Sequence, residues 1–231
     1  MNAGDAPAEF TRRCVAWSLD AALPALATLA LCWRGIDAGI AQASQALDAL
    51  SGAMARTMAD GLLAGGTPVD LTRAWLSDPA QRAAVASLSE AIAQLLWTPL
   101  PVFALLLLAW FVGFEASSRQ ATPGKRLLGL RVVDERGGRI GLVRAAQRHL
   151  AGALSWLTLN VGHLLAAIPP RRRSLHDRIA GTQVVQAANA GPLPAWARAW
   201  LALLALAAVA ALAWLFVAAS AAMQRAFDAM L

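Results

Sequence analysis

Residues 95–114, LLWTPLPVFALLLLAWFVGF, form a run of 20 residues without a charged side chain. A helix needs about 20 consecutive apolar residues to cross the hydrocarbon core of a bilayer. Residues 15–33, in which Asp20 is the one charged residue, and residues 200–223, which carry no charge, are two further apolar stretches of 19 and 24 residues. The sequence therefore predicts three transmembrane helices.

The composition of the whole chain favours the same class. Of its 231 residues, 58% are hydrophobic and 15% are charged, whereas soluble domains carry about 45–50% apolar and about 25% charged residues. This composition excludes a disordered chain and a disulfide scaffold. The net charge of +6 would suggest nucleic acid in a soluble protein. No nucleic-acid-binding motif accompanies the basic residues, so we expect no nucleic-acid partner.

The placement of lysine and arginine predicts the orientation in the membrane. Residues 119–148 hold eight basic residues, whereas the 60 residues of 35–94 hold three. The positive-inside rule places residues 115–148 in the cytoplasm, together with the N-terminal tail, residues 1–10. Residues 35–94 then lie outside. We predict a helical hairpin there, because apolar residues recur at helical spacing and Asp78 and Pro79 are typical of a helix start.

A fourth apolar segment, residues 150–168, contains Ser155, Thr158, Asn160 and His163. If it crossed the bilayer, it would export the arginines of residues 169–186 against the positive-inside rule. The polar and glycine residues at 160–163 are typical of a break. We therefore predict a re-entrant hairpin, with a spanning helix as the open alternative.

A small cytoplasmic antiparallel β-element is expected beside this segment. Residues 128–134 and 139–143 flank two glycines and predict a β-hairpin, to which residues 182–185 would add a third strand. The expected fold class is an all-α integral membrane protein with three full transmembrane helices, one re-entrant or spanning polar helix and this β-element. The membrane domain would cover residues 11–186, followed by a linker, residues 187–199, and an additional C-terminal helix.

Asp20 is the most costly charge in the predicted membrane, about six residues inside the first helix. An unpaired carboxylate in hydrocarbon costs several kcal/mol, so an ionisable group at such a position indicates a functional site. Glu115, at the end of the second helix, is expected at a similar depth. We predict a cation close to Asp20, supplied by one of four residues: Lys125, Arg126, Arg148 or Arg178.

Thr122, Pro123 and Gly124 predict a turn before Lys125, because proline fixes φ, glycine permits positive φ and threonine can bond locally. Lys125 is the only lysine, against 19 arginines. This usage suggests a specific role, such as pairing with Asp20 or Glu115 or binding an anionic group. The alternative is a plain topological anchor.

Two basic groups follow the fourth segment. Arg171, Arg172 and Arg173 are most simply a run that contacts anionic lipid at the membrane surface. The trio of His176, Asp177 and Arg178 can be interpreted in two ways. It could be proton-responsive, because histidine titrates near neutrality, or it could cap a helix and lock a loop.

Three blocks of this sequence resemble the RDD family of bacterial membrane proteins. They are RCVAWSLD at residues 13–20, FEASSRQATPGKRLLGLRVVD at 114–134 and RSLHDRIAGTQVV at 173–185. The family name refers to one arginine and two aspartates, which the resemblance carries to Arg13, Asp20 and Asp177. It implies a multi-pass protein of the bacterial inner membrane. Transport has been proposed for the family, and some members are linked to cation/proton exchange.

Two functions follow from these features. The first is a small transporter or ion-coupled permease component, acting through a cytoplasm-facing charged cluster and assembling as a homo-oligomer. The alternative is a membrane scaffold or partner-binding module in which the same charges are structural. We expect no enzymatic activity, no cofactor and no metal site, and we expect the lipid bilayer, anionic lipids included, as a partner. The cluster comprises Arg13, Asp20, Glu115, Lys125, His176, Asp177 and Arg178.

Overall fold

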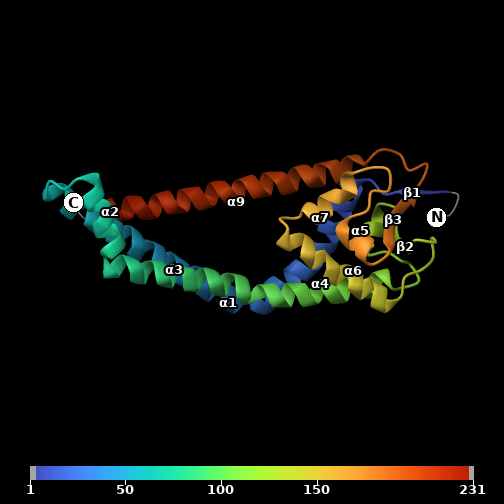
Figure 1. Cartoon of the computed structure of the whole chain (residues 1–231), viewed down its shortest axis with the longest axis horizontal. Coiled ribbons are helices and arrows are strands. Elements are labelled where there is room, and N and C mark those ends of the chain that lie inside the picture. Colours follow the sequence, from blue (N-terminus) through green and yellow to red (C-terminus); the bar gives the residue numbers. More distant parts are fainter. Residues whose placement is uncertain (1–3, 229–231) are drawn as a thin grey trace. The chain divides into compact units, whose positions relative to one another are not determined.

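The computed structural model describes residues 4–228 and is mostly helical (Figure 1). It divides into two compact units. Unit 1 comprises Met1–Thr28 and Val102–Ala202, and unit 2 comprises Leu29–Pro101 and Leu203–Leu231. Three helical stretches are long and apolar enough to cross a membrane: Phe10–Leu63, Pro79–Glu115 and Ala195–Arg225. The predicted membrane class is thereby supported, and the three spans fall where the sequence places them.

The first helix is longer than the sequence suggests. Helix α1, Phe10–Leu63, runs for 54 residues without interruption. Pro24 does not break it, and the Thr28 hydroxyl donates to the Pro24 carbonyl at 2.8 Å. The predicted first helix and the first arm of the predicted external hairpin are therefore one element.

The rest of that hairpin agrees with the sequence. Helix α2, Pro68–Ser77, is followed by α3, Pro79–Trp97, and by α4, Pro99–Glu115. The Asp78 side chain accepts a hydrogen bond from the Ala80 N–H at 2.8 Å and caps α3, with proline at the first helical position. The predicted helix start at this point is confirmed.

A three-stranded antiparallel sheet lies in unit 1. Strands β1, Asp5–Pro7, and β2, Leu130–Asp134, both pair with β3, Thr182–Ala187, which is the central strand. Arg131 faces Val185 across the β2–β3 ladder. The predicted pairing of these two segments is confirmed. Strand β1 comes from the segment that the sequence suggested to be a tail, and it completes the sheet.

The predicted strand at residues 139–143 is wrong. The turn after β2 closes on Asp134, whose carboxylate accepts from the Arg136 and Gly138 N–H groups at 2.9 and 2.7 Å. The chain then leaves the sheet. The Arg139 guanidinium binds the Ala116 carbonyl at 2.6 Å and Ile140 is buried in the core. Helix α6, Leu142–Leu157, begins directly afterwards.

The fourth apolar segment is bent, as the sequence predicts. Helix α6 is followed by α7, Val161–Leu164, and by a short 3-10 helix, Leu165–Ala167. The two arms form an angle of 118°. Leu159 and Asn160 have φ angles of 50° and 66° at the break, where the chain leaves helical geometry. Such a bend fits either a broken span or a re-entrant loop.

Two short helices and the last long helix complete the chain. Helix α5, Pro123–Leu127, has Thr122 as its N-cap, so the predicted turn is the first turn of a helix with proline at N1. Helix α8, Leu175–Ile179, precedes β3, and α9, Ala195–Asp228, is the last element. The core of unit 1 gathers the sheet and several helices around buried apolar side chains: Val15, Leu128, Val132, Ile140 and Val184.

Candidate functional site

Arg148 of α6 lies at the centre of a buried ionic network in unit 1. Its guanidinium binds both carboxylate oxygens of Glu115 of α4, at 2.8 and 2.9 Å. It also binds Asp177 of α8, at 3.0 and 3.1 Å. One planar cation therefore joins two carboxylates from two other helices, an arrangement that suits the fixed donor geometry of arginine.

Each carboxylate holds one further cation. Arg13 of α1 donates to Asp177 at 2.7 Å, and Lys125 of α5 donates to Glu115 at 2.5 Å. The result is a chain of alternating charge that connects five helices, in the order Arg13, Asp177, Arg148, Glu115, Lys125. We call these five residues the ionic network.

The network is almost completely removed from solvent. Asp177 and Glu115 are 0% and 1% exposed, and Lys125 and Arg148 are 6% and 7% exposed. Burying charges is costly unless each is paired and hydrogen-bonded. Removing one member would leave its neighbours as uncompensated buried charges, so the five side chains hold one another in place.

Asp20 is buried beside the network but makes different contacts. Its carboxylate accepts hydrogen bonds from the Thr122 hydroxyl and, at 2.7 Å, from the Gly124 N–H. The expected ion pair is not formed, because no ion pair within 4.0 Å among the described residues includes Asp20. Lys125 pairs with Glu115 instead, although the Asp20 charge still favours its protonated form. Asp20 therefore supplies from α1 the acceptor that α5 needs at its N-terminus.

Glycine is required where Asp20 meets α5. A Cβ atom on Gly124 would lie 2.5 Å from the Ala16 carbonyl oxygen and 2.9 Å from the Asp20 carboxylate. Both distances are shorter than a carbon–oxygen contact permits. The close approach of α1 and α5 thus explains Gly124 of the second resemblance block.

Asp177 also closes the N-terminus of α8. Its carboxylate accepts from the Ser174 N–H at 3.1 Å and from the Ser174 hydroxyl at 2.7 Å. Burial alone would raise the pKa of Asp177, but the charges of Arg13 and Arg148 outweigh it and hold the pKa well below its ordinary value. Asp177 is therefore ionised at any physiological pH. The helix-capping interpretation of this trio agrees with these contacts.

His176 touches the network from the side. Its Nε2 lies 3.2 Å from Arg148 Nη2, and because a guanidinium only donates, Nε2 must be the unprotonated acceptor. Burial and the neighbouring Arg148 charge hold the pKa of His176 well below its ordinary value. The ring of His163 lies 5.1 Å away, and the Nδ1 atoms of both rings are buried without a partner.

Lys125 is enclosed by an aromatic side chain as well as by Glu115. Its ammonium lies 4.7 Å from the centre of the Phe111 ring, and the same ring stacks on the ring of His149, with the ring centres 5.5 Å apart. Burial lowers the pKa of Lys125, although the Glu115 carboxylate acts in the opposite direction. The pairing with Glu115 is one of the specific roles that the sequence suggested for this lysine, beside pairing with Asp20 and binding an anionic group.

The structure separates the predicted site residues into two groups. Arg13, Glu115, Lys125, His176 and Asp177 come together, with Asp20 next to them through α5. The other predicted residues lie outside: Arg178 and Arg171 are exposed, Arg172 accepts from Arg13 through its carbonyl, and Arg173 pairs with Glu135 at 2.9 Å. Arg148, which the sequence suggested only as a partner for Asp20, is the central residue. The sequence carries no signal for this role, because Arg148 lies on the polar face of α6, which is the face that the structure buries.

No group of three or more His, Cys, Asp or Glu side chains in residues 4–228 is arranged to hold a metal ion. The contacts of the ionic network are ion pairs and hydrogen bonds between side chains. Together with three span-capable helices, this network defines the class: a membrane protein whose helices are joined by buried charges.

Comparison with known proteins gives the family. The model of the RDD family matches residues 7–181, and the chain belongs to that family. The uncharacterized protein YxaI of Bacillus subtilis (strain 168) is 39% identical over 70 residues, which are 30% of this chain and 46% of that protein. The chain thus matches less than half of the length of this relative. No solved structure matches.

Proposed function

We propose that this protein is a non-enzymatic membrane scaffold, or partner-binding module, in which the ionic network is structural. The observation that carries the proposal is Arg148, whose guanidinium is shared by Glu115 and Asp177 at 2.8–3.1 Å. Arginine keeps its proton under all physiological conditions. Charges fixed in this way hold five helices in one arrangement, which is what a platform for another membrane component needs.

The burial of the network supports the same proposal. A site that takes up and releases an ion needs carboxylate oxygens that can exchange partners. Both oxygens of Glu115 and both oxygens of Asp177 already bind basic side chains. Exchanging them would leave charges buried without partners, at a cost of several kcal/mol.

The proposed setting is the bacterial inner membrane, with the ionic network on the cytoplasmic side. Unit 1 holds 15 basic and 7 acidic residues, a net charge of +8, whereas unit 2 has a net charge of −2. The positive-inside rule favours the cytoplasm for unit 1. There the run of Arg171, Arg172 and Arg173 can contact anionic lipid, and a second copy or another membrane protein is the proposed partner.

A second candidate is a small cation- or proton-coupled transporter. One observation favours it: His176 is buried against the network, its Nδ1 has no partner, and the ring of His163 is close. A proton entering there would change the charge beside Arg148. In this case the cytoplasm-facing cluster would be a transport site, and a homo-oligomer would be needed to enclose a path.

Ion flux in proteoliposomes over several pH values separates the two candidates. If the protein is a scaffold, liposomes with the wild-type protein keep imposed Na⁺, K⁺ and pH gradients as long as empty liposomes do. The Asp177→Asn variant then loses the folded protein, because Arg13 and Arg148 lose their shared counter-charge. Faster dissipation of a gradient by the wild-type protein would contradict the scaffold.

Two further variants make the result sharper. Asp20→Asn keeps an acceptor oxygen for the Gly124 N–H and should cost less stability than Asp177→Asn. Asp48→Asn is the matched control, because Asp48 is 54% exposed and pairs with Arg225 at the surface. A transporter would show normal folding of Asp20→Asn together with lost flux.

A further inference from the structure

Helix α6 is apolar on the side that faces away from the protein. Its buried side carries Ala145, Arg148 and Ser155, whereas Val143 and Leu150 are 84% and 61% exposed. A helix on the surface of a soluble protein shows the opposite pattern, with apolar residues inward and polar residues outward. Helix α6 therefore needs a nonpolar surrounding on its outer side.

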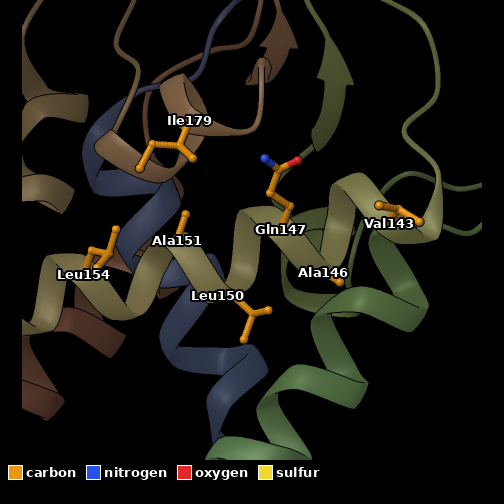
Figure 2. A pocket seen from close by; sticks show the side chains of 7 residues that line it. All are labelled: Val143, Ala146, Gln147, Leu150, Ala151, Leu154 and Ile179. Atoms are coloured by element: carbon orange, nitrogen blue, oxygen red, sulfur yellow. The ribbon is translucent and has the colours of Figure 1, made fainter.

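The outer side of α6 forms a shallow groove with a neighbouring helix. Figure 2 shows the lining residues that α6 contributes, following one another along the helix, with Ile179 of α8 close to Ala151. Their spacing of three and four residues is that of one helix face. Gln147 is the one polar side chain among the lining residues: Val143, Ala146, Gln147, Leu150, Ala151, Leu154 and Ile179.

We propose that this groove binds the acyl chains of anionic phospholipids, so that α6 lies in the membrane interface with its apolar face in the lipid and Arg148 facing the protein. A helix that is apolar on one face and polar on the other can lie in the plane of the interface. Helix α6 has 16 residues and is therefore about 24 Å long.

The charges at the groove favour a phospholipid with an anionic headgroup. Arg144 directly follows Val143 on α6, and Arg178 directly precedes Ile179 on α8; both arginines are exposed. The contact of Arg144 with Asp134 is long, 3.7 Å, and leaves it available for a headgroup. A phospholipid whose phosphate is bound by either guanidinium would have its acyl chains near the apolar lining.

Spin labels along α6 distinguish the occupants of the groove. Single cysteines replace Val143, Ala146, Leu150 and Leu154 in turn, in a chain with Cys14 and Cys32 changed to serine, reconstituted in phosphatidylglycerol-containing vesicles. Lipid contact gives high collision rates with oxygen and low rates with a water-soluble nickel chelate. Leu212 of α9 serves as the lipid control and Glu135 as the aqueous control, since both are well exposed.

Two results would overturn the proposal. High collision rates with the nickel chelate at Leu150 and Leu154 would mean that the groove faces water. Low rates with both reagents would mean that a protein covers it, such as a second copy of the chain.

The headgroup is tested with a fluorescent label at Leu150 in mixed vesicles. Brominated phosphatidylglycerol should quench the label at least twofold more than brominated phosphatidylcholine, and Arg144→Gln with Arg178→Gln should remove the difference. Equal quenching by the two lipids in the otherwise unchanged chain would overturn the anionic preference.

Discussion

The buried charges of unit 1 hold one another through geometry that only certain residues provide. Arg148 can bind two carboxylates because its donors point in several fixed directions, whereas lysine offers a single compact charge. Lys125, in contrast, ends between Glu115 and the ring of Phe111, where a compact ammonium fits and a wider guanidinium would need more space. The single lysine of the chain therefore stands where its size matters.

Gly124→Ala should destabilise the protein by about 1–3 kcal/mol, the usual cost of overpacking. The added methyl group would meet the Ala16 carbonyl oxygen at 2.5 Å, and backbone atoms cannot move aside cheaply. Thermal unfolding in detergent measures the change. Gly113→Ala is the control, because a Cβ there has nothing within 4 Å and alanine is the better helix former. Equal stability of the two variants would contradict the close approach of α1 and α5.

The pH dependence of stability should reflect His176. Arg148 of α6, Arg13 of α1, His163 of α7 and Asp177 of α8 act on it, and burial with the arginine charges holds its pKa well below the ordinary value. The unfolded chain binds a proton at this histidine below a pKa of about 6.5, whereas the folded protein binds it only at lower pH. The free energy of unfolding is therefore highest above about pH 6.5 and decreases as the pH falls below that value. The unfolding temperature should therefore fall between pH 7 and pH 5. His176→Gln should flatten the curve, and an unchanged slope would show that another group is responsible.

At the scale of single residues, the sequence predicts which charges are buried better than it predicts their partners. The cost of a carboxylate in the membrane identified Asp20 and Glu115. Their partners depend on how loops return to the helices, and Thr122 and Gly124 reach Asp20 through a helix of five residues that the pattern does not reveal. The central position of Arg148 arises from three helices that meet only in the folded chain.

At the scale of elements, periodicity and composition predicted the long helices, the cap at Asp78, the break in the fourth apolar segment and the pairing of β2 with β3. Strand β1 was missed because its three residues carry no alternating pattern, and its contacts, the pairing with β3 and the ion pair of Asp5 with Arg131, form only in the folded chain. The strand at residues 139–143 was predicted because these residues have β-propensity. The turn that closes on Asp134 does not bring them back alongside β2, and the chain leaves the sheet. Local propensity is overridden there by tertiary contacts.

The pairing of β2 with β3 makes a topological prediction. These strands flank the bent segment of α6 and α7, and antiparallel neighbours must lie on the same side of a membrane. Cysteines at Glu135 and Arg171 should therefore both react with an impermeant thiol reagent from the cytoplasmic side. A cysteine at Ala64, in the predicted external hairpin, should react only from the opposite side. Labelling of residue 171 from outside would mean that the segment spans.

At the scale of the whole molecule, the family domain and the two structural units do not coincide. The RDD match ends at residue 181, yet the core of unit 1 continues into the first turns of α9. Ala197 is fully buried there, and the Trp200 indole N–H donates to the Ser18 hydroxyl at 2.9 Å. The sequence could predict α9 as an apolar helix, but its apolar character is uniform and does not reveal which turns pack on protein.

This division of α9 can be tested with two shortened chains. A chain that ends after Ala202 keeps every residue of unit 1, whereas a chain that ends after Gly191 loses Leu193, Ala197, Trp200 and Leu201 from its core. We expect unit 1 to have nearly the same unfolding temperature in the longer chain as in the intact protein. The shorter chain should be less stable by on the order of 3 kcal/mol, because large side chains that are partly buried contribute about 1.5–3 kcal/mol each at most.

Unfolding in detergent, followed by near-ultraviolet circular dichroism, measures both chains under the same conditions. Trp200→Phe in the full-length chain separates the hydrogen bond to Ser18 from the apolar packing and should cost about 1 kcal/mol. If the two shortened chains have the same stability, the first turns of α9 add nothing to unit 1. If both fail to fold, unit 1 depends on Leu203–Leu231 as well, since the longer chain lacks only that segment.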